Sequence, residues 1–416
     1  MASVSVLEVL LHGEAIGTLT RIEGERSLFA FNDGYIADRN RPTLGLGFKD
    51  RLGELLTEFR PYRMRLMPFF SNLLPEDRLR DYLAARAGVN REREFFLLRA
   101  LGDDLPGAIA ARPADGGEWP PTTGEMLDED GARERRESAL RFSLAGVQLK
   151  FSALERAMGG LTIPAQGIGG SWIVKLPSER FAGVPENEFS MMTIARKLGI
   201  NVPALDLINV NDIGGLPADV AAIGGKALAV KRFDRSSAGG RVHVEDFAQI
   251  FGVYPRDKYK KASMVNIASV IAAESDSADI REFVRRLVFN TLIGNADMHL
   301  KNWAVYYPDK HAARLAPAYD FVSTIPYIAD NKAALTVSRG SRFDEFDADE
   351  LVDFAARVKL AKAPVLDTAR ETAELFRQHW NEEKNNLPLH PEVVAAIEKH
   401  LGTVPIYRKP IYQKQS

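Results

Sequence analysis

The stretch that most constrains this chain is a polar run at residues 295–302, which comes directly after an apolar one. Over residues 283–293 the apolar side chains recur at helical spacing, so we predict a helix there. Gly294 is placed to end that helix at its C′ position. The residues that follow are too polar, and their charges too closely spaced, to pack as core. The sequence therefore predicts a polar loop at the end of a buried helix.

The spacing within this loop is typical of phosphoryl transfer. Asp297 and Asn302 stand five positions apart, the offset between the catalytic aspartate and a metal-binding asparagine in protein kinases. A predicted β-hairpin over residues 303–317 follows, and Asp320 comes after it. Lys301 adds a cation able to stabilise transferring phosphate charge. Phosphoryl transfer needs a carboxylate base and oxygen ligands for Mg²⁺, so the pattern predicts kinase chemistry.

Parts of the loop also fit two other interpretations. Taken singly, Asp297 and Asn302 fit a polar loop that only caps a helix. Asp297 and His299 would also fit a metal-hydrolase pair, but no further histidine or acidic cluster follows at ligand spacing. The helix, loop, hairpin and Asp320 together favour the kinase.

Composition bounds the class of protein. With 416 residues, 45% of them hydrophobic, the chain can bury a large core and form two or three domains. Lysine and arginine number 54 against 56 acidic residues, so no overall basic field is available to hold nucleic acid. The absence of cysteine excludes disulfides and thiolate metal sites. No apolar run of about 18 residues and no signal-peptide pattern occur. We expect a cytoplasmic protein with no membrane contact.

The N-terminal part reads as a small α+β module over residues 1–112. A hairpin over residues 6–21 and a strand over 27–31 precede helical patterns, in which Pro75 and Asn90 stand at helix starts. Residues 113–138 are rich in Pro, Gly and acid, as in a solvated linker.

Beyond the linker, a loop of small residues at 141–150 precedes a strand and could lay backbone N–H groups against phosphates, which alone is a weak signal. Lys175 ends an apolar strand, where a lysine needs either an anionic partner or a route to solvent. A helix begins near Pro185. Its Glu188, in preference to Glu186, is a candidate partner for Lys175, although either acid also suits the helix dipole.

Further along, an apolar strand over residues 227–231 turns into charge where a kinase hinge would stand, and residues 244–247 open helical sequence. Asp347 fits a helix N-cap, and Pro391 opens a final helix that ends by Gly402.

These segments resemble the HipA family, the serine/threonine kinase toxins of bacterial type II toxin–antitoxin systems. In the family's order, they resemble its phosphate loop, nucleotide-lysine strand, hinge, catalytic segment and metal segment, at residues 143–150, 172–177, 230–235, 297–302 and 317–320. The β-rich module resembles its N-terminal subdomain. The resemblance implies an α+β, bilobal, protein-kinase-like fold with a helical C-terminal lobe. Its parts would be the subdomain 1–112, the linker 113–138, a nucleotide-binding lobe 139–235 and a catalytic lobe 236–416.

The resemblance also implies roles for individual residues. Asp297 is expected to be the catalytic base, Asn302 and Asp320 the Mg²⁺ ligands, and Ser143 the site of autophosphorylation. The expected ATP-binding residues are Ala145, Gly146, Val147, Gln148, Lys150, Lys175, Lys231, Phe233, His299, Lys301 and Tyr319. The chain departs from the family at Leu149, where a glutamate often stands, and at Lys231, where an acid can stand.

The function implied by the resemblance is an ATP- and Mg²⁺-dependent serine/threonine protein kinase that arrests growth. Its partner would be a HipB-like helix-turn-helix antitoxin, with DNA reached only through that antitoxin, and its substrate an aminoacyl-tRNA synthetase. Two alternatives stay open: a small-molecule kinase of the aminoglycoside type, and a non-catalytic pseudokinase that serves as a scaffold in a repressor complex.

Overall fold

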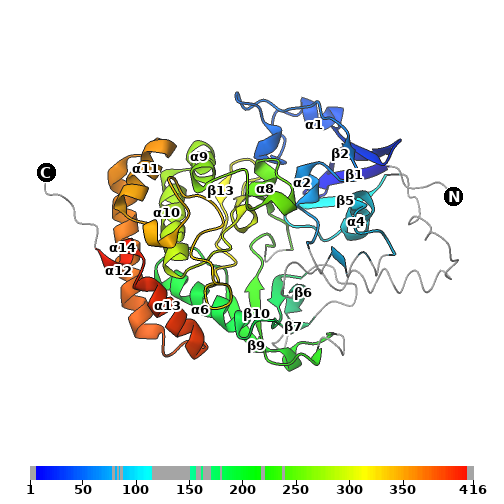
Figure 1. The fold of residues 1–416 in the computed structure, drawn as a ribbon. Helices are drawn as coiled ribbons and strands as arrows, with labels where there is room; N and C mark the ends of the chain where they lie inside the picture. The colour runs from blue at the N-terminus through cyan, green and yellow to red at the C-terminus, as the bar shows by residue number, and fades with distance from the viewer. Residues whose placement is uncertain are drawn as a thin grey trace. The chain divides into compact units, whose positions relative to one another are not determined.

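The computed structural model describes residues 6–76, 80–81, 84, 88–114, 150–155, 161–162, 170–178, 180–216, 221–236 and 239–409. The chain divides into two compact units (Figure 1). Unit 1 comprises Met1–Arg180, Ile208–Pro255 and Tyr306–Ala312, and unit 2 comprises Phe181–Leu207, Arg256–Val305 and Ala313–Ser416. The predicted α+β fold class, with a β-rich N-terminal subdomain and a helical C-terminal lobe, is confirmed. The boundaries of the four parts drawn from the sequence stay predictions.

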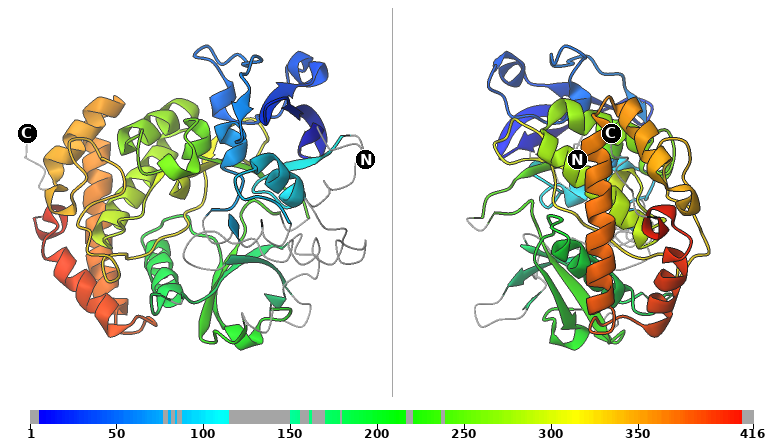
Figure 2. Two further views of the ribbon diagram at one scale, coloured as in Figure 1. Left: turned by 45° about the vertical axis from the view of Figure 1, so that its right-hand side comes forward. Right: turned by 90° about the vertical axis from the view of Figure 1, so that its left-hand side faces the viewer.

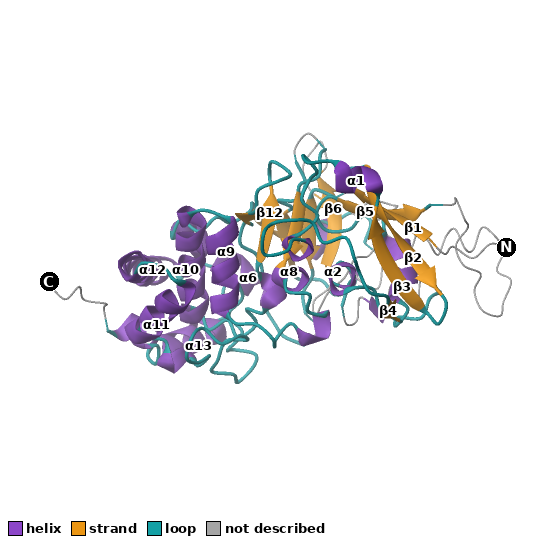
Figure 3. Cartoon of the chain, turned by 90° about the horizontal axis from the view of Figure 1, so that it is seen from above, coloured by secondary structure: helices purple, strands orange, loops and turns teal. Residues whose placement is uncertain are grey.

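The N-terminal part of unit 1 is built on a five-stranded antiparallel sheet in the order β4-β3-β2-β1-β5 (Figure 3). Its strands are β1 (Val6–Leu11), β2 (Glu14–Ile22), β3 (Arg26–Phe31), β4 (Tyr62–Arg63) and β5 (Ile109–Pro113). The predicted hairpin is β1–β2, in which Leu11 pairs with Glu14. Its helices are α1 (Asp33–Ala37), η1 (Leu46–Phe48), α2 (Pro68–Ser71) and α4 (Glu94–Leu101).

Aromatic rings fill the core beneath this sheet. Phe29 contacts Phe31, Phe48 and Phe70 at centroid distances of 4.8, 5.9 and 5.0 Å. Tilted and edge-to-face contacts of this kind add to the free energy of apolar burial. Because alternate residues of β1 to β3 point into this core, the alternating sequence pattern fixes which face each strand buries.

The prediction that Asn90 caps a helix is wrong. The N-cap of α4 is Arg93, and the Asn90 side chain instead accepts a hydrogen bond of 2.8 Å from the backbone N–H of Glu92, one turn earlier. An asparagine can form such a local turn as readily as a cap, and sequence alone does not distinguish the two. The helix predicted from Pro75 to Gly88 falls largely on residues outside the described ones.

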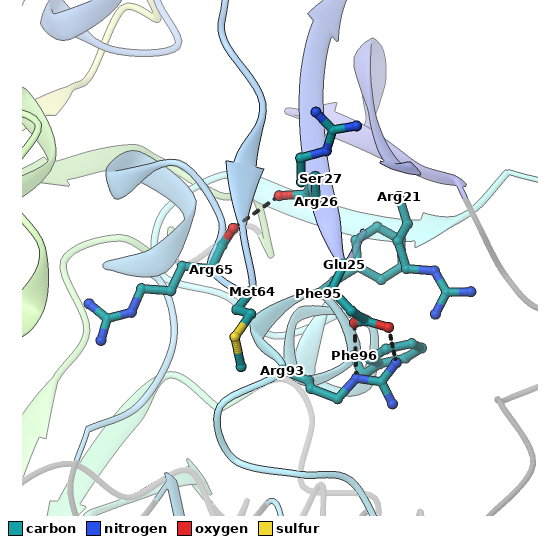
Figure 4. A pocket seen from close by; sticks show the side chains of 9 residues that line it. All are labelled: Arg21, Glu25, Arg26, Ser27, Met64, Arg65, Arg93, Phe95 and Phe96. Carbon is teal, nitrogen blue, oxygen red and sulfur yellow. Dashed lines mark hydrogen bonds and ion pairs between the residues drawn. The ribbon is translucent and has the colours of Figure 1, made fainter. Parts of the chain in front are cut away.

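The turn between β2 and β3 is tied to α4 at a small pocket (Figure 4). Nη2 and Nε of Arg93 donate to the two oxygens of the Glu25 carboxylate, at 2.9 and 3.2 Å. The Arg93 guanidinium also lies 4.3 Å from the Phe96 ring centroid. Because this pair is well exposed, we expect it to add at most about 1 kcal/mol to stability.

A second five-stranded sheet has the order β7-β6-β8-β10-β9. Its strands are β6 (Lys150–Glu155), β7 (Leu161–Thr162), β8 (Trp172–Lys175), β9 (Leu205–Asn209) and β10 (Lys226–Lys231). The strands predicted around Lys175 and over residues 227–231 are thus β8 and β10. In the antiparallel register Lys175 stands opposite Leu228 on one side and opposite Lys150 on the other. A short η2 (Val210–Asp212) follows β9.

The prediction that residues 244–247 open a helix is wrong for its first three positions. They belong to strand β11 (His243–Asp246), and helix α8 (Phe247–Ile250) begins only at Phe247. The strand buries alternate residues, His243 and Glu245, and both have no exposed surface. Asp246 then caps α8 in a capping box with Gln249. Because the buried residues of this strand are polar, the sequence does not show the apolar alternation that predicts a strand.

Unit 2 is mainly helical (Figure 2). Helix α10 (Ser277–Leu292) packs against α9 (Met264–Glu274) and against the long α12 (Lys362–Glu383), drawn in orange. Fully buried rings of Phe283, Phe289, Phe354, Phe376 and Trp380 lie in this core. The other elements of unit 2 are α6 (Val184–Lys197), η4 (Leu300–Asn302), β13 (Arg314–Leu315), η5 (Phe343–Glu345), α11 (Ala348–Val358), α13 (Pro391–Leu401) and α14 (Pro405–Arg408). The residues of η3 (Pro255–Asp257) and β12 (Ala304–Tyr307) are divided between the two units.

Several helix ends of unit 2 match the sequence predictions. Asp347 caps α11 by accepting from the backbone N–H of Glu350, and Pro391 is the first residue of α13. However, α13 is not the final helix, since α14 follows it. Within the described part of the chain, no helix is both long and apolar enough to cross a membrane.

Candidate active site

The polar loop of unit 2 begins where α10 ends. Gly294 follows the C-cap residue Ile293 and has a φ of +66°, as predicted for a C′ glycine. A Cβ added at Gly294 would lie 2.7 Å from Cδ1 of Ile325. Both the left-handed backbone and this close approach therefore require glycine where the helix turns into the loop.

Buried asparagines fix the first residues of the loop. Asn295 is 1% exposed, and its amide donates to the side chain of Asn290 at 2.8 Å. Its oxygen accepts from the backbone N–H of Asp297 at 3.0 Å. The backbone N–H of Ala296 donates to Oγ1 of Thr324 at 2.8 Å. The main chain leading into Asp297 is thus held by side chains from both sides.

Asp297 presents its carboxylate from this rigid backbone. Its side chain is 51% exposed, and Oδ1 accepts a 2.7 Å hydrogen bond from Oη of Tyr259. Nε2 of His299 lies 3.9 Å from the same oxygen, and the His299 ring packs edge-on against Tyr259 at 5.0 Å. The Asn302 amide donates to the main-chain oxygen of Asp297 at 2.8 Å. The base and the metal-binding asparagine predicted from spacing are therefore in direct contact.

The segment after the hairpin comes back to this loop. Asp320 has a φ of +57°, a conformation that is rare outside glycine, asparagine and aspartate. Its main-chain oxygen lies 3.5 Å from the side-chain nitrogen of Asn295. The neighbouring Tyr319 hydroxyl donates to the main-chain oxygen of Lys301 at 2.9 Å. These contacts bring the Asp320 segment against the polar loop.

The oxygen donors of this loop suit Mg²⁺. Among the described residues, no group of three or more His, Cys, Asp or Glu is placed to hold a metal by itself. Nucleotide-bound Mg²⁺ needs less, since one or two protein oxygens complete a shell supplied by phosphates and water. The Asn302 nitrogen donates to the Asp297 main chain, so its amide oxygen is the atom suited to a cation, and the Asp320 carboxylate is on the segment whose main chain contacts Asn295. These residues fit an ion that arrives with a nucleotide.

The structure brings six of the predicted site residues together in unit 2: Asp297, His299, Lys301, Asn302, Tyr319 and Asp320. Three others whose side chains the structure describes belong to unit 1. Lys175 is buried at the end of β8, Lys231 is exposed at the end of β10, and Phe233 is partly buried. Glu188 is buried on α6 of unit 2.

Most of the remaining predicted site residues are not among those that the structure describes. Ser143, Ala145, Gly146, Val147 and Gln148 are outside the described residues. Of Lys150 only the backbone is described, at the start of β6.

Sequence reasoning missed two contributors to the loop. Tyr259 holds the Asp297 carboxylate but stands 38 positions away, in a segment with no recognisable motif. Thr324 holds Ala296 from 28 positions away. A hydroxyl residue in a loop carries no signal of its partner, so only the folded chain reveals these two contacts.

Two family models match the chain. The model of the HipA N-terminal domain matches residues 7–112, and that of the HipA-like C-terminal domain matches residues 142–380. The chain belongs to the HipA family. The resemblance drawn from five sequence motifs is thereby confirmed.

Among relatives, the chain is 54% identical to a Sinorhizobium fredii protein, Y4dM, whose name proposes that it is a kinase. That match covers 98% of this chain and 99% of the relative. The chain is 30% identical to the serine/threonine-protein kinase toxin HipA of Shewanella oneidensis, over 80% of this chain and 81% of that protein. Family membership supports a HipA-type kinase.

A solved structure shares the fold. It is the complex of HipA, HipB and operator DNA from Shewanella oneidensis, matched with a TM-score of 0.71 at 24% identity. The match covers 97% of this chain and 99% of that HipA chain, and it supports the predicted fold class.

Proposed function

We propose that this protein is an ATP- and Mg²⁺-dependent serine/threonine protein kinase that acts as the toxin of a type II toxin–antitoxin module. The observation that supports this most is the contact between Asp297 and Asn302. A half-exposed carboxylate stands on a backbone that Asn295 and Asn302 hold in place, with Asp320 on the adjoining segment. Positioning of this kind is most of what an enzyme contributes to phosphoryl transfer.

Each residue then has a definite task. Bound Mg·ATP would supply the phosphoryl group and the cation that neutralises its charge. Asp297 would accept the proton of the acceptor hydroxyl, while Asn302 and Asp320 would provide the protein oxygens for the cation. Lys175 would pair with the nucleotide phosphates, with Glu188 as its proposed carboxylate partner, and Lys231 and Phe233 would hold adenine. His299, Lys301 and Tyr319 would serve the nucleotide as well, and Ala145, Gly146, Val147, Gln148 and Lys150 would cover its phosphates.

We propose the biological setting from the family. The Shewanella oneidensis structure holds HipA together with HipB and operator DNA. We propose that a HipB-like helix-turn-helix antitoxin binds the present chain and that the chain reaches DNA only through it. Because the net charge is −2, we expect the chain alone to bind DNA weakly or not at all. The proposed substrate is a translation protein of the aminoacyl-tRNA synthetase class, and the proposed autophosphorylation site is Ser143.

Phosphate transfer to protein tests the catalytic assignment. Asp297→Asn should bind Mg·ATP as the parent does but transfer phosphate at least about 100-fold more slowly, because the amide cannot accept the hydroxyl proton. Asp320→Ala should instead weaken Mg·ATP binding itself. Transfer by Asp297→Asn at the parent rate would show that the base is misassigned, and transfer to aminoglycosides but not to protein would refute the protein kinase.

Mass spectrometry of the same samples tests Ser143. The parent incubated with Mg·ATP should gain a phosphate there, and this modification should lower nucleotide affinity, since it adds about −1.5 to −2 charge near the site for ATP phosphates. Phosphate found only at other residues would remove Ser143 from the proposal.

A further inference from the structure

The segment proposed to read adenine alternates in burial. We call residues 230–235 the hinge segment. Lys231 is exposed and Phe233 only partly buried, whereas Arg232 and Asp234 are 8% and 7% exposed. Charged side chains inside a core need complete pairing, because an unpaired buried charge is strongly unfavourable. The partners of Arg232 and Asp234 therefore decide where the hinge segment lies.

Asp234 is saturated with donors. Its two oxygens accept from Nε and Nη2 of Arg232, at 2.9 and 2.8 Å, in a two-pronged arrangement. Nη1 of Arg235 donates at 2.8 Å, and the backbone N–H of Gly107 donates at 2.9 Å. Burial alone would raise the pKa of Asp234, but Arg232, Arg235 and the Gly107 N–H together outweigh this and lower it to about 2. The carboxylate is thus charged at neutral pH.

The second anion comes from the N-terminal subdomain. Oδ1 of Asp104 lies 3.1 Å from Nη2 of Arg235 and 3.4 Å from Nη1 of Arg232. Its Oδ2 accepts from Oγ of Ser152, on β6, at 3.3 Å. We call Asp104, Ser152, Arg232, Asp234 and Arg235 the hinge clamp. Two arginines face two aspartates in it, so the buried charges balance only when Asp104 is present.

The loop that carries Asp104 makes further contacts with the hinge segment and with Val244. Gly107 has a φ of +71°, and a Cβ added there would lie 2.8 Å from the backbone nitrogen of Val244. Arg235 also donates to the main-chain oxygens of Gly107 and Leu105, at 3.0 and 3.1 Å. A shift of residues 104–107 must therefore move the hinge segment as well.

We propose, on the basis of the nucleotide site proposed above, that the hinge clamp makes the N-terminal subdomain a positioning element for adenine, with Asp104 and Ser152 as positioning residues. Arg232 and Asp234 hold one face of the hinge segment, and this sets Lys231 and Phe233 on the other. The subdomain thus controls nucleotide affinity and selectivity without touching the nucleotide.

Asp104→Asn in the full chain tests this. The amide keeps the shape of the carboxylate but leaves two buried guanidiniums facing one anion. The Kd for Mg·ATP, measured by calorimetry, should rise about tenfold, within the range reported for residues coupled to a site through a network. The Kd for Mg·GTP should change by less than about twofold, so the preference for ATP over GTP should fall. General destabilisation would weaken both nucleotides equally.

Asp103→Asn is the matched control. Asp103 is the adjacent residue of the same loop, but its side chain is 50% exposed and pairs with an exposed Arg112. Its replacement should leave both Kd values unchanged. Ser152→Ala removes a hydroxyl and no charge, so the ATP Kd should rise by only about threefold. This variant can be measured even if Asp104→Asn folds poorly.

The outcomes separate the clamp from the chemistry. Unchanged ATP affinity and selectivity in both Asp104→Asn and Ser152→Ala would overturn the positioning role, and so would equal effects of Asp103→Asn and Asp104→Asn. A parent that binds ATP but transfers no phosphate would refute the proposed kinase and leave the clamp intact, because the readout is binding. A parent that binds no nucleotide would overturn the clamp as well.

Discussion

The loop of Asp297 and the hinge clamp each hold a carboxylate, and they do so in opposite ways. Asp234 in the clamp is 7% exposed, and arginines and a backbone N–H occupy its oxygens. Asp297 is half exposed, and Asn295 and Asn302 hold its main chain while the carboxylate faces solvent. In the clamp the carboxylate is fully used by contacts within the protein. In the loop the carboxylate is half exposed and accepts from Tyr259, which is why we propose that it acts on a substrate.

The largest expected effect separates the two aspartates by stability. Asp234→Asn should lower the free energy of unfolding by about 3–5 kcal/mol, since it leaves buried guanidiniums without their anion. Asp297→Asn should change it by less than about 0.5 kcal/mol, because the side chain is exposed. Chemical denaturation of both variants measures this. Similar losses in the two would break the comparison.

A smaller effect should distinguish two glycines that both follow a helix C-cap. Gly294 and Gly199 have φ values of +66° and +77°, but only at Gly294 would a Cβ meet a neighbour within 4 Å. Gly199→Ala should cost about 1 kcal/mol of stability from backbone strain alone. Gly294→Ala adds a clash with Ile325, so we expect about 2–4 kcal/mol and a slower kinase. Equal melting temperatures of the two variants would show that Ile325 yields freely.

A third effect concerns another buried carboxylate of unit 1. Oε1 of Glu245 accepts from the Tyr307 hydroxyl and from the backbone N–H of Leu46, the latter at 2.8 Å. Burial raises the pKa of Glu245 to about 8. Unlike Asp234, Glu245 is thus mostly protonated at neutral pH, and Glu245→Gln should cost only about 1 kcal/mol.

The pH dependence of stability checks this assignment. Because the folded-state pKa of Glu245 lies above its usual value of 4.5, its contribution is complete below pH 4.5 and is lost as pH rises towards 8. Burial lowers the pKa of His243 to about 4, which acts in the opposite sense below pH 6.5. Between pH 6.5 and 8 the free energy of unfolding of the parent should therefore fall by about 1–2 kcal/mol more than that of Glu245→Gln. Parallel curves for the two proteins would contradict a raised pKa.

The smallest effect is expected at Tyr259. Tyr259→Phe removes the 2.7 Å hydrogen bond to Asp297 and keeps the ring against His299. Phosphate transfer should slow by about three- to tenfold, because a hydrogen bond at a half-exposed site typically contributes about 0.5–1.5 kcal/mol. The melting temperature should hardly change, since Tyr259 is 46% exposed. A large loss of stability would mean that Asp297 is as much a structural residue as Asp234.

The sequence predicted local features of the site well. Helical spacing and Gly294 located the end of α10, and the five-residue offset identified Asp297 and Asn302, which proved to be in contact. It could not predict partners contributed from distant segments, such as Tyr259 and Thr324, because pairing across long separations leaves no local pattern. It also misassigned residues 244–246, since a strand that buries a histidine and a glutamate does not show the usual apolar alternation.

The contacts of Asp104 and Gly107 determine where the chain can be cut into separate fragments. The two family models end and begin between residues 112 and 142, which invites cutting the chain there. A fragment that begins after the cut would still carry Arg232 and Arg235, but not Asp104, and the main-chain groups of Gly107 would be gone. We therefore expect a fragment cut there to be less stable than the full chain, because its buried arginines lack one of their two anions. A replacement N-terminal segment from a relative should be accepted only if it carries an aspartate and a glycine at the positions of Asp104 and Gly107.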